Sequence, residues 1–268
     1  LSQAIKIIMN SFYGILGSTG CRFYDPRLSG SITKRSHEIL KQTKVWIESL
    51  NYKVIYGDTD SIFVSVGDSL TQAQSLELGQ ELQQFINERW VKEIDTNFQT
   101  QCYLDIEFET HFSQFFMPAI RGAAQGLQNN ELSSQLGTKK RYVGQVIEGS
   151  AKKLIFKGLE TVRSDWTALA KDFQRSLYQQ VFDEKSVSEI NYYIRSIVTD
   201  IQTGALDHKL IYRKRLRRKL ELYVKNVPPH VKAARFADQQ NAELGKPLKY
   251  QNKGWIEYVI TQSGPQAK

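Results

Sequence analysis

The chain has 268 residues, of which 41% are hydrophobic and 24% charged, a composition typical of one large globular domain or two modest ones. No apolar run approaches the roughly 18 residues needed to cross a bilayer, which argues against a membrane protein. The chain starts at Leu1, inside an expected helix and without a secretory leader, so we expect a fragment of a longer protein.

Two helices are predicted at the start of the chain. Apolar residues at three- and four-residue spacing predict the first over residues 1–16. Asp25 as N-cap and Pro26 in the first turn predict the start of the second. The apolar residues expected on its buried face are Leu28, Ile32, Ile39, Leu40, Trp46, Ile47 and Leu50.

A hairpin and a long helix are predicted next. The periodicity changes to two, which predicts strands over residues 52–56 and 61–66 around a tight turn at residues 57–60. Helical periodicity returns over residues 72–98.

The middle of the chain is predicted to be rich in strands and the remainder rich in helices. Alternating patterns predict strands over residues 103–109, 112–118, 140–148 and 153–157. Residues 123–136, rich in Gln, Asn, Ser and Gly, are expected to form an exposed loop. From Trp166 onward the patterns predict helices over residues 167–182, 187–203 and 230–244, then a short strand over residues 255–261. We therefore expect an α+β fold with a domain boundary near residue 165.

Positive charge is concentrated in one region. The formal net charge is +8, yet residues 205–253 alone contain 13 Lys or Arg and 4 Asp or Glu, so the rest of the chain nets −1. A neutral body with one cationic region suggests a polyanion partner, and the interleaved Tyr and Arg favour nucleic acid. The alternative is a solvated helix face. Cys21 and Cys102 lie far apart without metal-ligand spacing and indicate reduced, buried thiols of a cytosolic protein. A basic chain with no leader and few cysteines fits the bacterial cytoplasm.

Two pairs of acidic residues are candidate metal ligands. In extended backbone, Asp58 and Asp60 would project from the same side of the hairpin, where Mg²⁺ could neutralise their mutual repulsion. Aspartate is also common in turns for capping reasons, which is the alternative explanation. Glu107 and Glu109 alternate along a predicted strand and could face the same ion, or form a polar outer surface.

The first helix carries a possible nucleotide-binding face. Lys6, Asn10 and Tyr13 are spaced i, i+4, i+7 and share one face of the helix. These side chains could hold a phosphate, contact a base edge and support a sugar. They could equally be the solvated side of an amphipathic helix.

Four motifs together resemble family B DNA polymerases. Residues 6–14, with Lys6, Asn10, Ser11, Tyr13 and Gly14, resemble motif B on the second fingers helix, and residues 56–61, Tyr-Gly-Asp-Thr-Asp-Ser, resemble motif C. Residues 139–142, Lys-Lys-Arg-Tyr, and residues 157–165, which include Gly158, Glu160, Arg163 and Asp165, resemble the segments that lead from palm to thumb. The basic stretch at residues 212–218 resembles bacterial members of the family.

The resemblance implies roles for individual residues. Asp58 and Asp60 would hold two catalytic Mg²⁺ ions, with Glu109 a further acidic residue near the metals. Lys6 would contact the incoming triphosphate, and Asn10 and Tyr13 would line the nascent base pair. The residues implied to bind DNA are Lys139, Lys140, Arg141, Tyr142, Arg213, Lys214, Arg215, Arg217 and Arg218.

The resemblance also implies the domain organisation. Residues 1–20 would end the second fingers helix, residues 21–164 would form part of an antiparallel-sheet palm with packed helices, and residues 165–268 would form a mainly helical, incomplete thumb. Motif A would lie upstream, so we expect this chain to bind primer–template DNA yet to be inactive by itself. The full-length enzyme would add dNTPs to a primer 3′-hydroxyl, with a sliding clamp as a candidate partner.

Two other functions fit parts of the sequence. A non-catalytic DNA-binding module could keep the palm–thumb shape and bind duplex DNA whether or not Mg²⁺ and nucleotide are present. Another two-metal phosphotransferase, such as a nuclease, would be expected to cluster more acidic or His residues than the four scattered histidines here.

Overall fold

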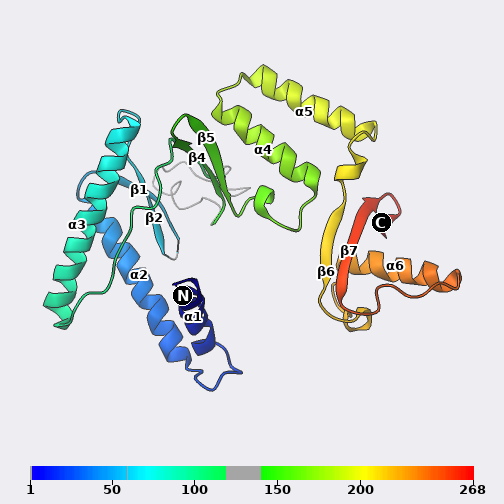
Figure 1. The fold of residues 1–268 in the computed structure, drawn as a ribbon, viewed down its shortest axis with the longest axis horizontal. Coiled ribbons are helices and arrows are strands. Elements are labelled where there is room, and N and C mark those ends of the chain that lie inside the picture. Colours follow the sequence, from blue (N-terminus) through cyan, green and yellow to red (C-terminus); the bar gives the residue numbers. More distant parts are fainter. Residues whose placement is uncertain (1, 59, 119–139) are drawn as a thin grey trace, which may run out of the picture. The chain divides into compact units, whose positions relative to one another are not determined.

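The computed structural model describes residues 2–58, 60–118 and 140–268 (Figure 1). These residues form two compact units. The first contains the chain up to His111, and the second contains Phe112–Pro118 and Lys140–Lys268. Within the described residues, no helix is long and apolar enough to cross a membrane.

The first unit confirms the order of elements predicted for residues 1–98. It contains α1 (Ser2–Leu16), α2 (Pro26–Glu48), the antiparallel hairpin β1 (Lys53–Asp58) and β2 (Ser61–Ser65), and α3 (Gln72–Phe98). Asp25 caps α2 by accepting a hydrogen bond from the Arg27 amide at 2.9 Å. Thr71 and Gln74 form a capping box at the start of α3, so local signals fix both helix starts.

The core of the first unit lies between α2 and α3. Trp46 of α2 and Trp90 of α3 meet edge to face, with ring centroids 4.8 Å apart, and Ile47 and Ile86 are buried beside them. The Trp90 indole donates a buried hydrogen bond to the Thr43 hydroxyl at 3.0 Å. The indole nitrogen of Trp90 is therefore satisfied where the two helices pack.

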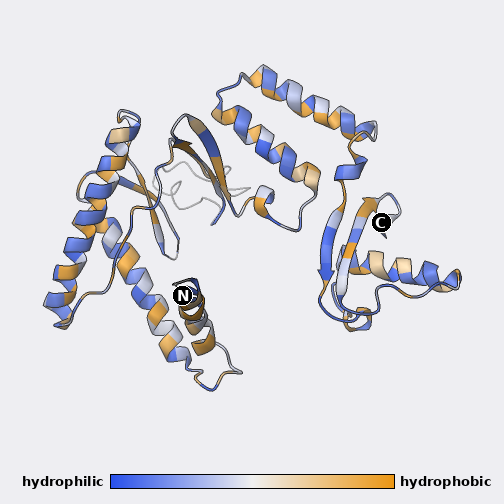
Figure 2. Cartoon of the chain, in the orientation of Figure 1, coloured by the Kyte–Doolittle hydropathy of each residue, from blue (hydrophilic) through white to orange (hydrophobic). Residues whose placement is uncertain are grey.

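The burial predicted along α2 is wrong for part of the helix. Trp46 and Ile47 are buried, and Ile39 and Leu40 are half-buried. The other three predicted residues are exposed: Leu28, Ile32 and Leu50. The core at the C-terminal end of α2 is built with α3. The start of α2 has α1 beside it, a helix rich in hydrophobic residues (Figure 2), and most of these side chains are exposed.

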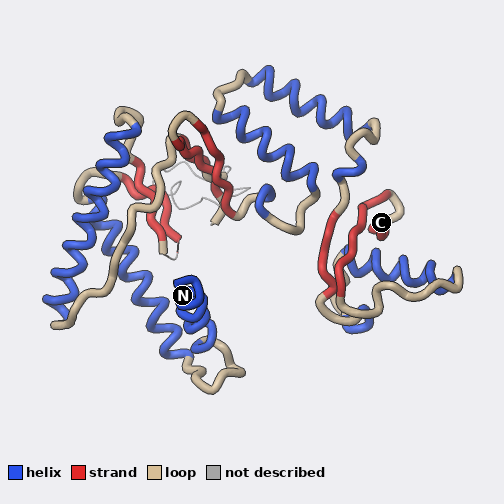
Figure 3. The backbone as a smooth tube through the Cα atoms, viewed as in Figure 1, coloured by secondary structure: helices blue, strands red, loops and turns tan. Residues whose placement is uncertain are grey.

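The strand predicted over residues 103–109 is also wrong, because these residues form no strand (Figure 3). Their alternation nevertheless holds: Leu104 and Ile106 pack on the core, while the intervening residues are exposed. The Ile106 amide donates to Asn87 Oδ1 at 2.9 Å, and the Phe108 amide donates to Gln83 Oε1 at 2.7 Å. Side chains of α3 therefore satisfy the backbone amides that a neighbouring strand would otherwise satisfy.

The second unit begins with a three-stranded antiparallel sheet in the order β3-β4-β5. The strands are β3 (Gln114–Phe116), β4 (Tyr142–Glu148) and β5 (Ala151–Lys157). They confirm three predicted strands, although β3 is shorter than expected. Val143, Phe156 and Leu159 are buried with Phe182 of α4 (Ala168–Phe182), so this helix packs on one face of the sheet. The 3₁₀ helix η3 (Glu160–Val162) and α5 (Val187–Gln202) flank α4 along the chain.

A second antiparallel sheet, in the order β6-β7-β8, lies among the helices of the C-terminal region. Its strands are β6 (Tyr212–Leu216), β7 (Gly254–Thr261) and β8 (Gly264–Ala267). Only β7 was predicted. Leu216 and Ile256 are fully buried against Val231 of α6 (Pro229–Glu243), which covers one face. Lys214 and Leu216 both lie on the covered face of β6. Because one of these two positions is a lysine, the sequence lacks the apolar alternation that would predict a strand.

The predicted palm–thumb boundary near residue 165 stays a prediction. The two compact units differ from it in extent, because Phe112–Pro118 join the sheet of the second unit. The loop predicted over residues 123–136 lies outside the described residues. The fold is α+β, with small antiparallel sheets and packed helices.

Candidate functional site

The hairpin β1–β2 presents the two candidate metal ligands at its tip. The register pairs Asp58 with Ser61 and leaves residues 59 and 60 between the strands, of which Thr59 lies outside the described residues. The Asp60 amide donates to the Asp58 carbonyl at 2.5 Å, which tightens the turn. Asp58 is half-buried and Asp60 is exposed. The predicted hairpin is confirmed, and its tip places two carboxylates close together in the chain.

The structure does not group the further acidic residues with this tip. Glu107 and Glu109 lie on the exposed side of the extended segment that runs along α3. Among the described residues, no three His, Cys, Asp or Glu side chains form a group that could hold a metal ion. Carboxylates are the ligands that Mg²⁺ prefers, so Asp58 and Asp60 fit this ion chemically. The assignment of Asp58, Asp60 and Glu109 as ligands stays a prediction.

The predicted nucleotide-binding residues lie on the exposed surface of α1. Lys6 and Asn10 are exposed, and Tyr13 is 50% exposed. The Tyr13 hydroxyl is 3.0 Å from the Thr33 hydroxyl of α2 and forms a hydrogen bond with it. Tyr13 is therefore positioned by α2, a contact that no pattern in the sequence indicates. The roles of the three residues stay predictions.

Two motifs that are separate in sequence lie together in the second unit. Gly158 has φ of +62°, and a Cβ atom there would lie 1.9 Å from the Lys140 carbonyl oxygen. Only glycine allows the backbone to pass so close to Lys140 at this φ. Gly158 thus fixes the strand ends that carry residues 140–142 and 157–160. Lys139 lies outside the described residues.

Arg141 is held by a half-buried polar network. Its guanidinium forms an ion pair with Glu160, and Gln174 of α4 donates to the same carboxylate at 2.6 Å. Gln174 Oε1 also accepts from the Thr161 amide at 2.8 Å. Burial raises the pKa of the Glu160 carboxyl, but the hydrogen bonds from Gln174 and Arg141 outweigh it, so the pKa lies below its usual range. Sequence analysis missed Gln174, because only tertiary packing brings α4 to this site.

The basic strand β6 divides the predicted DNA-binding cations into two groups. Arg213 and Arg215 are exposed, and Arg213 stacks over the Trp255 ring with 4.7 Å between guanidinium carbon and centroid. Lys214 is partly covered, and its Nζ is 3.4 Å from the Asp165 carboxylate. Beyond the strand, Arg217 and Arg218 are exposed, and Arg218 lies over the Tyr223 ring at 4.8 Å.

Asp165 connects the start of the helical region to β6. Arg163 donates to both oxygens of the Asp165 carboxylate, at 3.0 and 2.7 Å, and Lys214 approaches the same group. These hydrogen bonds, mainly the pair from Arg163, hold the pKa of the Asp165 carboxyl well below its usual range. The sequence singled out Arg163 and Asp165 by motif, but not their connection to Lys214.

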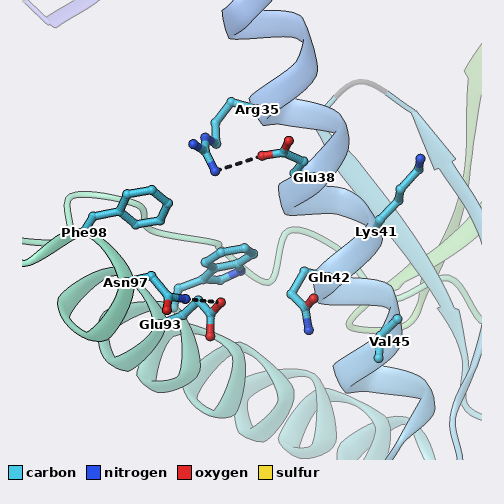
Figure 4. Close-up of a pocket in the computed structure, with 9 residues that line it drawn as sticks. Arg35, Glu38, Lys41, Gln42, Val45, Glu93, Asn97 and Phe98 are labelled. Atoms are coloured by element: carbon cyan, nitrogen blue, oxygen red, sulfur yellow. Dashed lines mark hydrogen bonds and ion pairs between the residues drawn. The ribbon is translucent and has the colours of Figure 1, made fainter.

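A shallow hollow of about 330 Å³ lies between α2 and α3, away from these motifs (Figure 4). Arg35 pairs with Glu38 at 2.8 Å on one wall, and Asn97 donates to Glu93 at 2.7 Å on the other. None of the predicted site residues within the described ranges lines it. Four of its polar side chains are thus paired within the walls of the hollow.

Comparisons with known proteins agree with the motifs. The sequence profile of DNA polymerase family B matches residues 2–117 and 132–268. The chain is 49% identical over 266 residues to DNA polymerase II of Escherichia coli, covering 99% of this chain and 32% of that protein. It is 28% identical over 262 residues to a DNA polymerase of Archaeoglobus fulgidus, covering 97% of this chain and 28% of that protein.

A eukaryotic relative matches over the same extent. The chain is 27% identical over 273 aligned residues to the DNA polymerase alpha catalytic subunit of Mus musculus, covering 98% of this chain and 16% of that protein. The chain therefore spans about a third or less of the length of these relatives. Since the family profile and the E. coli relative both match nearly all of it, this chain belongs to DNA polymerase family B.

Proposed function

We propose that the full-length protein performs template-directed DNA synthesis, adding dNTPs to a primer 3′-hydroxyl. The observation that carries the proposal is the hairpin tip with Asp58 and Asp60, in a chain that belongs to DNA polymerase family B. Two adjacent carboxylates are hard oxygen donors suited to Mg²⁺, and bound Mg²⁺ would stabilise charge on the attacking and leaving oxygens of phosphoryl transfer. Glu109 remains a candidate further ligand.

The other predicted residues would bind and orient the substrates. The exposed Lys6 would neutralise triphosphate charge, and Asn10 and Tyr13 would line the nascent base pair. Lys140 and Tyr142 would contact the primer terminus, together with Lys139. Because Arg141 pairs with Glu160, it would mainly hold this backbone in place beside the primer.

Asp60→Asn in the full-length protein tests the assignment. The substitution removes a metal-binding charge at an exposed position, so primer extension should be lost while primer–template affinity is retained. Asp68→Asn is the matched control, since Asp68 is also an exposed aspartate after β2, and it should extend primers normally. Normal extension by Asp60→Asn would show that the site assignment is wrong.

We also propose that these 268 residues bind primer–template DNA but do not extend it, because motif A of the family resemblance is not among them. A thumb making about 4 to 6 phosphate contacts gives a log–log salt slope of roughly −4 to −5. Metal-dependent extension by the isolated chain would contradict the inactivity. Unchanged affinity with and without Mg²⁺ and nucleotide in the full-length protein would favour a non-catalytic DNA-binding module.

A further inference from the structure

Gln174 of α4 connects two neighbouring residues of η3. Its Nε2 donates to the Glu160 carboxylate at 2.6 Å, and its Oε1 accepts from the Thr161 amide at 2.8 Å and from the Thr161 hydroxyl at 2.5 Å. Thr161 is buried and Gln174 is half-buried. One side-chain amide therefore donates and accepts at the same time, which neither an ionised carboxylate nor an apolar side chain can do.

The carboxylate that Gln174 holds is also the partner of Arg141. Glu160 accepts from Gln174 through one oxygen and pairs with Arg141 through the other. The Glu160 side chain is 19% exposed, so salt screens this pair less than it screens a pair on the open surface. Gln174 therefore fixes the position of the anion to which Arg141 is bound.

The backbone next to Arg141 has an unusual conformation. Lys140 has a φ of +65°, in the left-handed region that residues with a Cβ atom rarely adopt. Gly158, with a φ of +62°, passes directly beside the Lys140 carbonyl. Left-handed residues other than glycine persist where the surrounding contacts hold them. The Arg141 side chain, bound to Glu160, is a contact of this kind.

The same contact determines how Tyr142 is placed. Val143 is buried with Phe182 of α4, and Arg141, two residues earlier, also turns toward α4. Tyr142 lies between them and points to the other face, where its ring centroid is 5.3 Å from that of Phe115. Because successive side chains of a strand leave one backbone in opposite directions, a backbone fixed through Arg141 also fixes Tyr142.

We propose that Gln174 is a positioning residue for the primer terminus. It holds Glu160, and Glu160 anchors Arg141. The fixed backbone then presents Lys140 and Tyr142 to the primer. The inference rests on the proposed function, in which these two residues contact the primer, and it adds the residue of α4 that keeps them in place. A shift of about 1 Å at a reacting group can slow a reaction by about 100-fold, so a loosened primer terminus should slow nucleotide addition.

The test measures single-turnover nucleotide addition by the full-length protein bound to primer–template DNA, over a series of dNTP concentrations with Mg²⁺. Gln174→Met keeps the length of the side chain and removes its hydrogen bonds. The maximal rate should fall on the order of 10- to 100-fold. The dNTP concentration that gives half the maximal rate should stay unchanged, because the residues proposed to bind the dNTP lie in α1. A loss of stability alone would lower the melting temperature and leave this maximal rate unchanged.

The matched control is Gln179→Met. Gln179 is another half-buried glutamine of α4, but it donates to Asp183, at 3.1 Å, rather than to Glu160. This variant should keep the wild-type rate.

Gln174→Glu tests positioning through its pH dependence. The new carboxylate would lie beside that of Glu160, and repulsion between the two raises the pKa of the pair. When the pair binds one proton, a carboxylic acid can again donate to Glu160 and accept from Thr161, as the amide does. The rate relative to the wild type should therefore rise as the pH falls from about 8 to about 6. The relative rate of Gln174→Met should stay constant over this range.

The charged neighbours of Glu160 do not titrate in the same range. Arg141, Arg163 and Tyr178 interact with it electrostatically. The two guanidiniums stay charged, and burial together with the Glu160 charge raises the pKa of the Tyr178 hydroxyl above its usual value of about 10. The pH response of Gln174→Glu therefore reports the new pair of carboxyl groups.

Two results would overturn the inference while leaving the proposed function intact. One is a maximal rate of Gln174→Met equal to that of Gln179→Met. The other is a relative rate of Gln174→Glu that does not change with pH, and this result decides the matter even if Gln174→Met does not fold. A wild-type protein that does not extend primers with Mg²⁺ would contradict the proposed function itself.

Discussion

Residues 103–109 and residues 212–216 have the same kind of sequence pattern and very different structures. Both alternate polar and covered positions, yet the first segment runs along α3 without forming a strand, and the second is the strand β6, paired with β7. In the first, the side chains of Gln83 and Asn87 of α3 accept hydrogen bonds from the backbone amides. In the second, the backbone of the neighbouring strand β7 forms these hydrogen bonds. Alternation thus predicts which side chains are covered, but not which groups form hydrogen bonds with the backbone amides and carbonyls.

The largest effect is expected in the strand. Leu216→Ala removes a fully buried side chain from the core between β6 and α6, so the free energy of unfolding should fall by about 2–5 kcal/mol. Leu222→Ala is the control, because Leu222 lies nearby in the 3₁₀ helix η5 (Leu220–Leu222) and is 55% exposed. Urea denaturation followed by circular dichroism measures both. Similar losses in the two variants would mean that the strand is not held by this core.

A smaller effect is expected where side chains replace a strand. Asn87 Nδ2 donates to the Ile106 carbonyl and to Asp105, and Asn87 Oδ1 accepts from the Ile106 amide. Asn87→Ala leaves half-buried backbone groups unpaired and should cost about 1–3 kcal/mol. Hydrogen exchange of the Ile106 amide should accelerate with it.

The matched control for that experiment is Asn97→Ala. Asn97 lies on the same helix but donates to Glu93 in an exposed hydrogen bond, so its loss should leave the exchange of Ile106 unchanged. If Asn87→Ala also leaves exchange at Ile106 unchanged, α3 does not hold the extended segment.

The smallest effect is expected at the ion pair behind β6. The pKa of the Asp165 carboxyl is lowered, mainly by Arg163, so the charged form stabilises the fold above about pH 4, and this contribution is lost as the pH falls. Asp165→Asn should therefore flatten the acid side of the stability profile, with a loss of at most about 1 kcal/mol at pH 7.

Lys214→Met should retain most of the acid dependence, because Arg163 remains bound to Asp165. Thermal unfolding of the two variants is compared from about pH 7 down to about pH 3, because carboxylates begin to be protonated at the acid end of this range. Equal flattening in both would mean that Lys214, rather than Arg163, dominates the network.

The sequence predicted only those parts of the site that are encoded by residues close together in the chain. The hairpin that carries Asp58 and Asp60 and the helix that carries Lys6 and Asn10 follow from short-range patterns. The network of Arg141 with Glu160 and Gln174 does not, because Arg141 directly precedes β4, whereas Glu160 lies in η3 and Gln174 in α4. The same holds for Arg213 and Trp255, which are 42 positions apart in sequence and meet only through strand pairing.

The sequence by itself determined the helix starts, the hairpin and the membership of DNA polymerase family B, because caps, turns and motifs are encoded by neighbouring residues. Only the tertiary structure decided which alternating segment pairs as a strand, which face of β6 stays exposed, and that Gly158 must pass beside Lys140. Those outcomes depend on which distant groups satisfy backbone hydrogen bonds and bury apolar surface, and such partners have no fixed spacing along the chain.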